Sequence, residues 1–210
     1  MTIWQVIVLT FVTATFFPER TTTVDKMNAT GETKLAVRYV INTEKSSTRF
    51  SIRHVGINRV RGAFGEVAGH VDIAPGGSSL TSVAAIQVAS IETGIRRRDR
   101  HLLSDSFFAE QDFPEITFVS SAVSDIKGNQ FQLAGLLKIK GIERPIVLDV
   151  RSQPAVFFTD RPPEYLEFTA EATVNRRDFE IDGGTSGRMI GNKARIELIV
   201  FAELDSLNMD

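Results

Sequence analysis

The sequence predicts an all-β fold, an eight-stranded antiparallel up-and-down barrel with one short crossover helix. From about residue 37 onward, apolar and polar residues alternate in one segment after another, which is typical of strands with one buried and one wet face. Turn-forming residues separate these segments at short intervals, for example at Pro75-Gly76-Gly77 and Lys127-Gly128-Asn129. Closing about eight such strands into a barrel leaves no sheet edge exposed, so closure is the economical solution.

The alternation also assigns side chains to the two faces of each strand. In residues 49–53 apolar and polar side chains alternate, and the same period recurs in the later segments. Because successive side chains of a strand point to opposite faces, the apolar set is expected inside the barrel. The expected interior set, which would line any cavity, is Phe50, Ile52, Phe64, Phe118, Phe131, Leu133, Leu148 and Phe168. Small residues are expected on this face at Ala122, Ala170 and Ala172, and charged residues outside at Arg49, Arg53, Asp149 and Glu167.

Two segments depart from simple alternation. Residues 59–73 form one long expected strand whose three glycines predict bulges or sharp coiling, as the corners of a small barrel require. Residues 83–91 are apolar on both faces, so another element has to cover their outer side. The candidate is the amphipathic stretch 96–108, of which 96–104 has a helical pattern. We expect it to lie against the outside of the barrel or to cap one end.

Composition excludes several classes of function. The chain is 42% hydrophobic and 24% charged with a net charge of −2, which is typical of a soluble globular protein and offers no global basic field for nucleic acid. The chain has no cysteine, and its three histidines, His54, His70 and His101, lack the spacing of metal ligands. No nucleophile elbow and no phosphate-binding loop occurs in the sequence. We therefore expect no enzyme, no catalytic residue, no metal and no cofactor.

The N-terminal residues have a different character from the rest. Residues 3–17 are mostly apolar and about as long as the core of a signal peptide, although no Lys or Arg precedes them. We predict a signal peptide or other non-structural leader over residues 1–26, a linker over 27–36 and a barrel domain over 37–205. Export to the periplasm or secretion is expected; a translation start at Met27 is the alternative and would leave the protein cytoplasmic. No later apolar run is long enough to predict a membrane span.

The barrel interior decides the function, and two readings of it remain open. Fifteen Phe against one Trp and two Tyr is a bias toward aromatic surface without polar groups. A filled Phe-rich core would account for these residues, and so would a cavity for one apolar ligand. The small residues interspersed on the interior face favour the cavity.

Four ordered blocks of sequence carry a resemblance to a known family. They run from Ile41 to Phe64, from Ser90-Ile91-Glu92-Thr93-Gly94 through Arg98-Asp99 and His101-Leu102 to Phe118, from Gly135 to Ile146, and from Phe168 to Phe179. Together they span roughly residues 37–203, and the chain resembles the YceI-like family, lipocalin-type barrels that bind polyisoprenoids. In one departure, Lys45 stands where the family usually has a histidine.

The resemblance implies a non-catalytic binding or carrier protein. Its ligand would be a long-chain isoprenoid lipid, either a polyprenyl pyrophosphate or a quinone-like molecule, with its head near His54, Arg98 and His101. A structural reading of the same region makes Asp99 a helix cap and Arg98 its ion-pair partner. The alternative function is a stress-response or interaction protein whose barrel binds another amphiphile, such as a fatty acid or amide, or no ligand. A homodimer is compatible with the sequence.

Overall fold

The computed structural model describes residues 36–55, 59–157 and 162–205. The predicted leader and all but the last residue of the predicted linker lie outside these ranges. The strands are β1 (Val37–Ile41), β2 (Ser47–His54), β3 (Arg59–Phe64), β4 (Val67–Ile73), β5 (Leu80–Gln87), β6 (Ile91–Glu92), β7 (Glu115–Lys127), β8 (Gln130–Ile139), β9 (Ile142–Gln153), β10 (Tyr165–Asn175) and β11 (Ile190–Leu204). The one α-helix of the described residues is α1 (Arg96–Leu102), and short 3-10 turns are η1 (Pro75–Gly77), η2 (Val88–Ser90), η3 (Arg176–Phe179) and η4 (Gly184–Met189).

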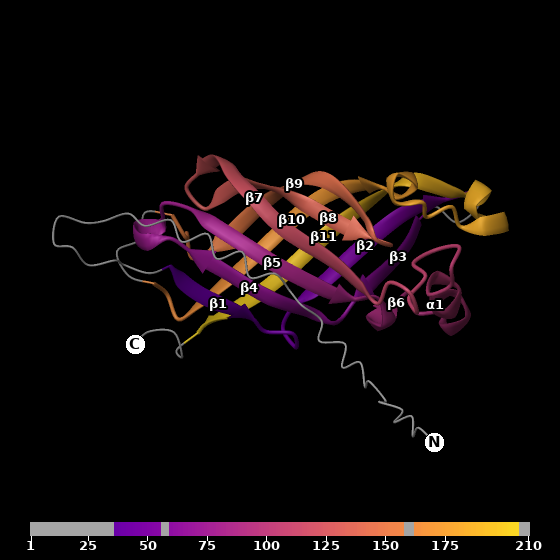
Figure 1. The fold of residues 1–210 in the computed structure, drawn as a ribbon, viewed down its shortest axis with the longest axis horizontal. Helices are drawn as coiled ribbons and strands as arrows, with labels where there is room; N and C mark the ends of the chain where they lie inside the picture. Colours follow the sequence, from indigo (N-terminus) through magenta and orange to yellow (C-terminus); the bar gives the residue numbers. More distant parts are fainter. Residues whose placement is uncertain (1–35, 56–58, 158–161, 206–210) are drawn as a thin grey trace, which may run out of the picture. The chain divides into compact units, whose positions relative to one another are not determined.

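The strands close into an eight-membered antiparallel ring. Its order is β1-β4-β5-β7-β8-β9-β10-β11, and β11 pairs back onto β1. Strands β2, β3 and β6 continue the barrel wall beyond β1, β4 and β5, so that each of these three pairs of strands crosses the wall once. Near its C-terminal end β11 pairs with β1, and along the rest of its length it pairs with β2. Strand β2 then pairs with β3, and β3 pairs with β6. Each pass therefore neighbours the next in sequence, which confirms the predicted up-and-down barrel (Figure 1).

The predicted long strand 59–73 is interrupted, and each of its three glycines is explained by a different feature of the structure. The break falls at Gly65, between β3 and β4. Gly62 lies beneath the ring of Phe50, where a Cβ atom would come within 2.5 Å of the ring. Gly69 has a φ of +140°, and a Cβ there would lie 2.1 Å from the carbonyl oxygen of Val83. Glycine is required at Gly69 because no other residue adopts this backbone without strain.

A bulge in β7 overturns one part of the sequence pattern. Ser120 pairs with Gly135, but the next pair is Ala122 with Ala134, so one residue of β7 is extra. The side-chain alternation inverts beyond this point. Ala122, predicted to face the interior, is exposed, and Val123 turns inward to pack against the core instead. The prediction for Ala122 was therefore wrong.

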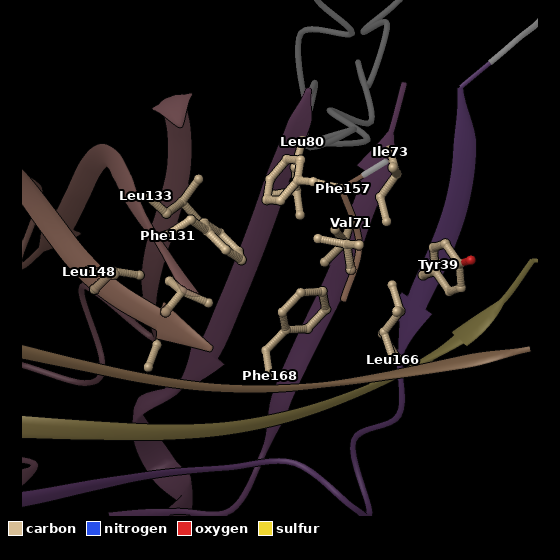
Figure 2. Close-up of a cluster of buried hydrophobic side chains, with 14 residues drawn as sticks. Tyr39, Val71, Ile73, Leu80, Phe131, Leu133, Leu148, Phe157, Leu166 and Phe168 are labelled. Atoms are coloured by element: carbon tan, nitrogen blue, oxygen red, sulfur yellow. The ribbon is translucent and has the colours of Figure 1, made fainter. Parts of the chain in front are cut away.

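Two apolar clusters lie toward the two ends of the barrel. At one end Phe157, from the segment after β9, joins side chains from several strands that point toward one another (Figure 2), and its ring meets that of Phe131 edge-on at 5.0 Å. At the other end Leu102, Phe107 and Phe108 pack over the ends of the strands, together with the segment that follows β10. The amphipathic stretch 96–108 thus caps one end of the barrel, which is one of its two expected placements. Figure 1 shows α1 and the orange segment after β10 at this same end.

Candidate ligand cavity

A cavity of about 370 Å³ lies between the two end clusters. This volume falls within the range of small-molecule binding sites, and the walls are almost entirely apolar. The structure therefore contains the cavity rather than a completely filled core. All eight side chains predicted for the interior line it, namely Phe50, Ile52, Phe64, Phe118, Phe131, Leu133, Leu148 and Phe168. The four charged residues expected outside, Arg49, Arg53, Asp149 and Glu167, are exposed.

The cavity is elongated along the barrel. On β8 its lining runs from Phe131 to Ile139. At about 3.3 Å per residue and a strand tilt of about 40°, these eight steps correspond to roughly 20 Å along the barrel axis. Such a shape fits a linear apolar chain better than a compact ring system.

Polar side chains gather at the end of the cavity that α1 caps. His54, Arg98 and His101, the three predicted head-group residues, all line this end. The structure thus brings together residues from β2 and α1 that are more than forty positions apart in sequence. His101 is the one exposed residue among those that line the cavity, so the cavity reaches the surface beside it. We call this opening the mouth.

Hydrogen bonds fix the orientation of Arg98. Its Nε donates to the hydroxyl of Thr93 and its Nη2 to the carbonyl oxygen of Thr93, both at 2.7 Å. Asp99 accepts from the backbone N–H of Thr93 at 2.9 Å and from its hydroxyl, so it caps the loop before the helix instead of pairing with Arg98. Within the described residues Nη1 of Arg98 has no hydrogen-bond partner, which leaves two N–H donors for a ligand.

The two histidines at the mouth differ in their surroundings. Nδ1 of His54 lies 2.8 Å from the carbonyl oxygen of Val55 and donates a hydrogen bond to it. The ring of His101 packs edge-on against Phe107 with 5.0 Å between centroids. Both histidines line the cavity near Arg98.

A second, buried guanidinium lines the same end of the cavity. Arg176 is only 5% exposed and donates to five backbone carbonyl oxygens, those of Ile181, Asp182, Gly187, Ile190 and Gly191. Burial lowers the pKa of Arg176, and the neighbouring Arg177 lowers it further. No carboxylate lies within ion-pair distance of Arg176 among the described residues, so its charge is stabilised by carbonyl dipoles. It holds the segment 181–191 against the end of the barrel.

One polar atom inside the cavity has no partner. The hydroxyl of Thr48 is buried, lines the cavity, and forms no hydrogen bond with the described part of the chain. Thr48 lies six residues before His54 on β2, roughly 20 Å along the strand at about 3.3 Å per residue. A buried hydroxyl without a partner is unfavourable, and a ligand oxygen or nitrogen would satisfy it.

The sequence reasoning missed Arg176, although a signal for it existed. The interior residues of β10 alternate from Phe168 to Val174, and Arg176 stands at the next position of the same parity. A charged residue at the next inward-facing position of an apolar strand is a candidate for a buried functional or structural group. Lys45, which replaces the usual histidine of the family, lies outside the cavity, pairs with Glu203 at 3.1 Å and sits over the ring of Phe201.

Two further findings concern the described residues only. They contain no group of three or more His, Cys, Asp or Glu side chains arranged to hold a metal ion. None of their helices has the length and apolarity to cross a membrane.

Sequence comparison relates the chain to known proteins. The model of the YceI-like domain family matches residues 39–202. Among curated proteins, UPF0312 protein SAS2572 of Staphylococcus aureus strain MSSA476 is 32% identical over 164 aligned positions, covering 72% of this chain and 89% of the relative. UPF0312 protein SA2479 of strain N315 is 30% identical over the same coverage.

Solved structures show the same fold. BcnA of Burkholderia cenocepacia superposes with a TM-score of 0.66 at 19% identity, covering 77% of this chain and 98% of that protein. The YCEI protein of Campylobacter jejuni gives a TM-score of 0.62 at 25% identity, covering 73% of this chain and 89% of its own. A polyisoprenoid binding domain from Saccharophagus degradans gives 0.61 at 15% identity, covering 82% of this chain and all of that domain.

Proposed function

The chain belongs to the YceI-like domain family, and from this premise we propose that it is a non-catalytic carrier of a long-chain isoprenoid lipid held in the barrel interior. The observation that carries the proposal is the division of the cavity into an elongated apolar body and one end with guanidinium groups. Such a site suits an amphiphile with a long hydrocarbon tail and a polar head. The Saccharophagus degradans domain, described as polyisoprenoid binding, supports this class of ligand.

The apolar body supplies the affinity. Burying apolar surface is worth about 25 cal/mol per Å², so each five-carbon unit of a tail contributes a few kcal/mol before ordering costs. The tail would lie along Phe118, Phe131 and Phe168, whose rings carry no polar group that would need a partner.

The mouth supplies the choice of head group. Arg98 lines the cavity, is oriented by its two bonds to Thr93, and keeps the two N–H donors of Nη1 without a partner among the described residues. A guanidinium favours phosphate oxygens because its planar fork donates parallel hydrogen bonds. We therefore propose a pyrophosphate head near Arg98, with His54 and His101 beside it, in preference to an uncharged quinone.

A second ligand class is favoured by one specific observation. The unpartnered hydroxyl of Thr48 lies deep in the cavity, where a pure hydrocarbon tail offers no acceptor. An amphiphile with an oxygen or nitrogen atom along its chain, such as an amide, would satisfy it. Replacing Thr48 with valine separates the two classes, because it weakens the binding of such a ligand and leaves or improves the binding of an isoprenoid.

Head-group preference is tested by binding titrations with a polyprenyl pyrophosphate and a quinone carrying the same tail. Arg98→Ala should weaken the pyrophosphate roughly 10- to 100-fold, the loss expected for a charge-assisted hydrogen bond, and leave the quinone nearly unchanged. Arg96→Ala is the matched control, since Arg96 is exposed on the same helix and does not line the cavity. Equal losses for both ligands in a folded Arg98→Ala variant would show the head-group assignment to be wrong.

We also propose that the carrier acts outside the cytoplasm, in the periplasm or as a secreted protein. The apolar run at residues 3–17 supports export. Cell fractionation with mass measurement of the chain tests this, because export predicts a chain outside the cytoplasm that begins between residues 14 and 27, whereas a cytoplasmic chain, either full-length or begun at Met27, contradicts it.

A further inference from the structure

We infer that the mouth of the barrel is a docking surface for a bilayer that carries anionic phospholipids. This inference rests on the proposed carrier function for its purpose, since a lipid carrier has to exchange its ligand with a membrane. Its evidence is independent of the ligand: a set of exposed apolar side chains around the mouth and a surplus of arginines beside them. We call this set the mouth surface, consisting of Val55, Ile95 and Met189 with Arg53, Arg59, Arg61, Arg96, Arg97, Arg100 and Arg188.

The apolar members come from three separate elements that meet at one end. Val55, Ile95 and Met189 are 66%, 53% and 49% exposed. The backbone N–H of Val55 donates to the carbonyl oxygen of Met189 at 2.8 Å, so the end of β2 and the end of η4 are adjacent. Thr93 packs beside Gly62 on β3, so the chain that leads from Thr93 to Ile95 leaves from the side of that strand. Their position at the end where the cavity opens makes this end the candidate interaction site.

The charges beside them identify the partner. Residues 53–61, 95–102 and 176–189 contain ten arginines and four carboxylates, those of Asp99, Asp178, Glu180 and Asp182, whereas the whole chain has 24 basic and 26 acidic residues. Asp99 accepts hydrogen bonds from Thr93. The seven arginines of the mouth surface are all exposed, and none of them forms an ion pair with the described residues. Apolar side chains flanked by unpaired arginines are the pattern of a protein surface that rests on anionic headgroups.

Docking in this orientation would place the cavity opening against the bilayer. His101, at the mouth, belongs to the same short helix as Arg96, Arg97 and Arg100. A lipid tail could then pass from the bilayer directly into the cavity, because the cavity opens beside His101 on this helix. At the opposite end of the barrel, Phe157 and its neighbours form a buried apolar cluster.

The absence of cysteine from the sequence permits a position-specific test on the full chain. Met189→Cys and, as the control, Val147→Cys each carry one environment-sensitive fluorophore; Val147 is 51% exposed on β9, a strand of the barrel wall. Vesicles of phosphatidylcholine with 30% phosphatidylglycerol are compared with vesicles of phosphatidylcholine alone. We expect a blue shift and protection from an aqueous quencher at position 189 only, and with anionic vesicles only. Because the label reports its own position, membrane binding through residues 3–17 does not produce this pattern.

Charge removal gives the second readout. Arg96→Gln combined with Arg97→Gln should lower partitioning onto the anionic vesicles roughly 25-fold, about fivefold for each charge. Arg151→Gln is the matched control, since Arg151 is exposed near the other end of β9, where it pairs with Gln130 away from α1, and it should change partitioning little. Equal partitioning of the double variant and the wild type would overturn the inference.

Three further outcomes would also overturn the inference. The first is a blue shift of both labels or of neither. The second is a blue shift of the label at position 189 with vesicles that lack anionic lipid. The third is a blue shift of that label when the protein concentration alone is raised, which would assign the surface to a second copy of the chain. The pyrophosphate and quinone titrations are made without vesicles. A chain that binds an isoprenoid there but shows no label shift refutes docking and leaves the proposed function standing, and the converse result refutes the function alone.

Discussion

Replacing Arg176 with methionine tests how the mouth end of the barrel is held together. The guanidinium is 5% exposed and donates to five backbone carbonyl oxygens between residues 181 and 191. Methionine has a similar length but no donor, so the variant leaves those oxygens without their partner. A buried acceptor that loses its partner costs about 1–3 kcal/mol, and water reaches some of the five, so we expect a loss of about 3–5 kcal/mol in the free energy of unfolding.

This loss is a large part of the stability of an ordinary domain, about 5–15 kcal/mol. At a typical dependence on urea, it corresponds to a fall of at least about 1 M in the unfolding midpoint. The midpoint should be followed by circular dichroism, because the one tryptophan of the chain, Trp4, lies outside the barrel domain. Hydrogen exchange should speed up in residues 181–191 of Arg176→Met before the strands themselves are affected.

Arg177→Met is the matched control for this experiment. Its side chain is 52% exposed, donates to Asn192 and lies 3.9 Å from Asp182, and such surface contacts are worth about 0–1 kcal/mol. If Arg176→Met and Arg177→Met unfold at the same urea concentration, the carbonyl contacts of Arg176 do not stabilise this end, and the reasoning is refuted.

Other predictions concern the barrel wall and the leader. Burial raises the pKa of Tyr39 to about 12, so the folded state favours the neutral phenol. The resulting contribution to the free energy of unfolding, about 2–3 kcal/mol, is present below pH 10 and is lost as the pH rises toward 12. In urea titrations at pH 9 and pH 11, Tyr39→Phe should lose less free energy of unfolding between the two pH values than the wild type does. An unchanged pH dependence would contradict this prediction. Gly69→Ala should destabilise the barrel by at least about 2 kcal/mol, because its Cβ would meet the carbonyl of Val83. Gly65→Ala, with open space around its Cβ, should stay within about 0.5 kcal/mol, and equal midpoints for the two glycine variants would refute the steric argument. A chain without residues 1–26 should fold and bind ligand as the full chain does; loss of soluble protein would assign that segment a structural role.

The fold was predictable because strand alternation is a local property. A period of two places Phe131 and Leu133 on one face whatever else the chain does, and turn residues mark where each strand ends. The inversion after Ser120 was not predictable, because a bulge arises from the pairing of β7 with β8 and leaves no mark in the alternation of β7 alone. The plug by Phe157 likewise depends on contacts between distant strands.

The candidate site was predictable to a similar extent. The apolar lining followed from parity, whereas the grouping of His54, Arg98 and His101 came from a family resemblance and not from spacing. The carbonyl cage of Arg176 could not be foreseen, because its acceptors are backbone atoms whose positions depend on how the segment 181–191 folds back. Parity marks such a residue as buried but does not identify its partners.

The measurement that tests the carrier function most directly is mass spectrometry of an organic extract of the purified protein. A barrel that carries an isoprenoid should yield one long-chain isoprenoid lipid in about equimolar amount. A folded Ala172→Phe variant should yield much less, because Ala172 lines the cavity and the larger ring occupies the space of the tail. An extract with no lipid, a lipid without isoprene units, or equal yields from both proteins would contradict the assignment.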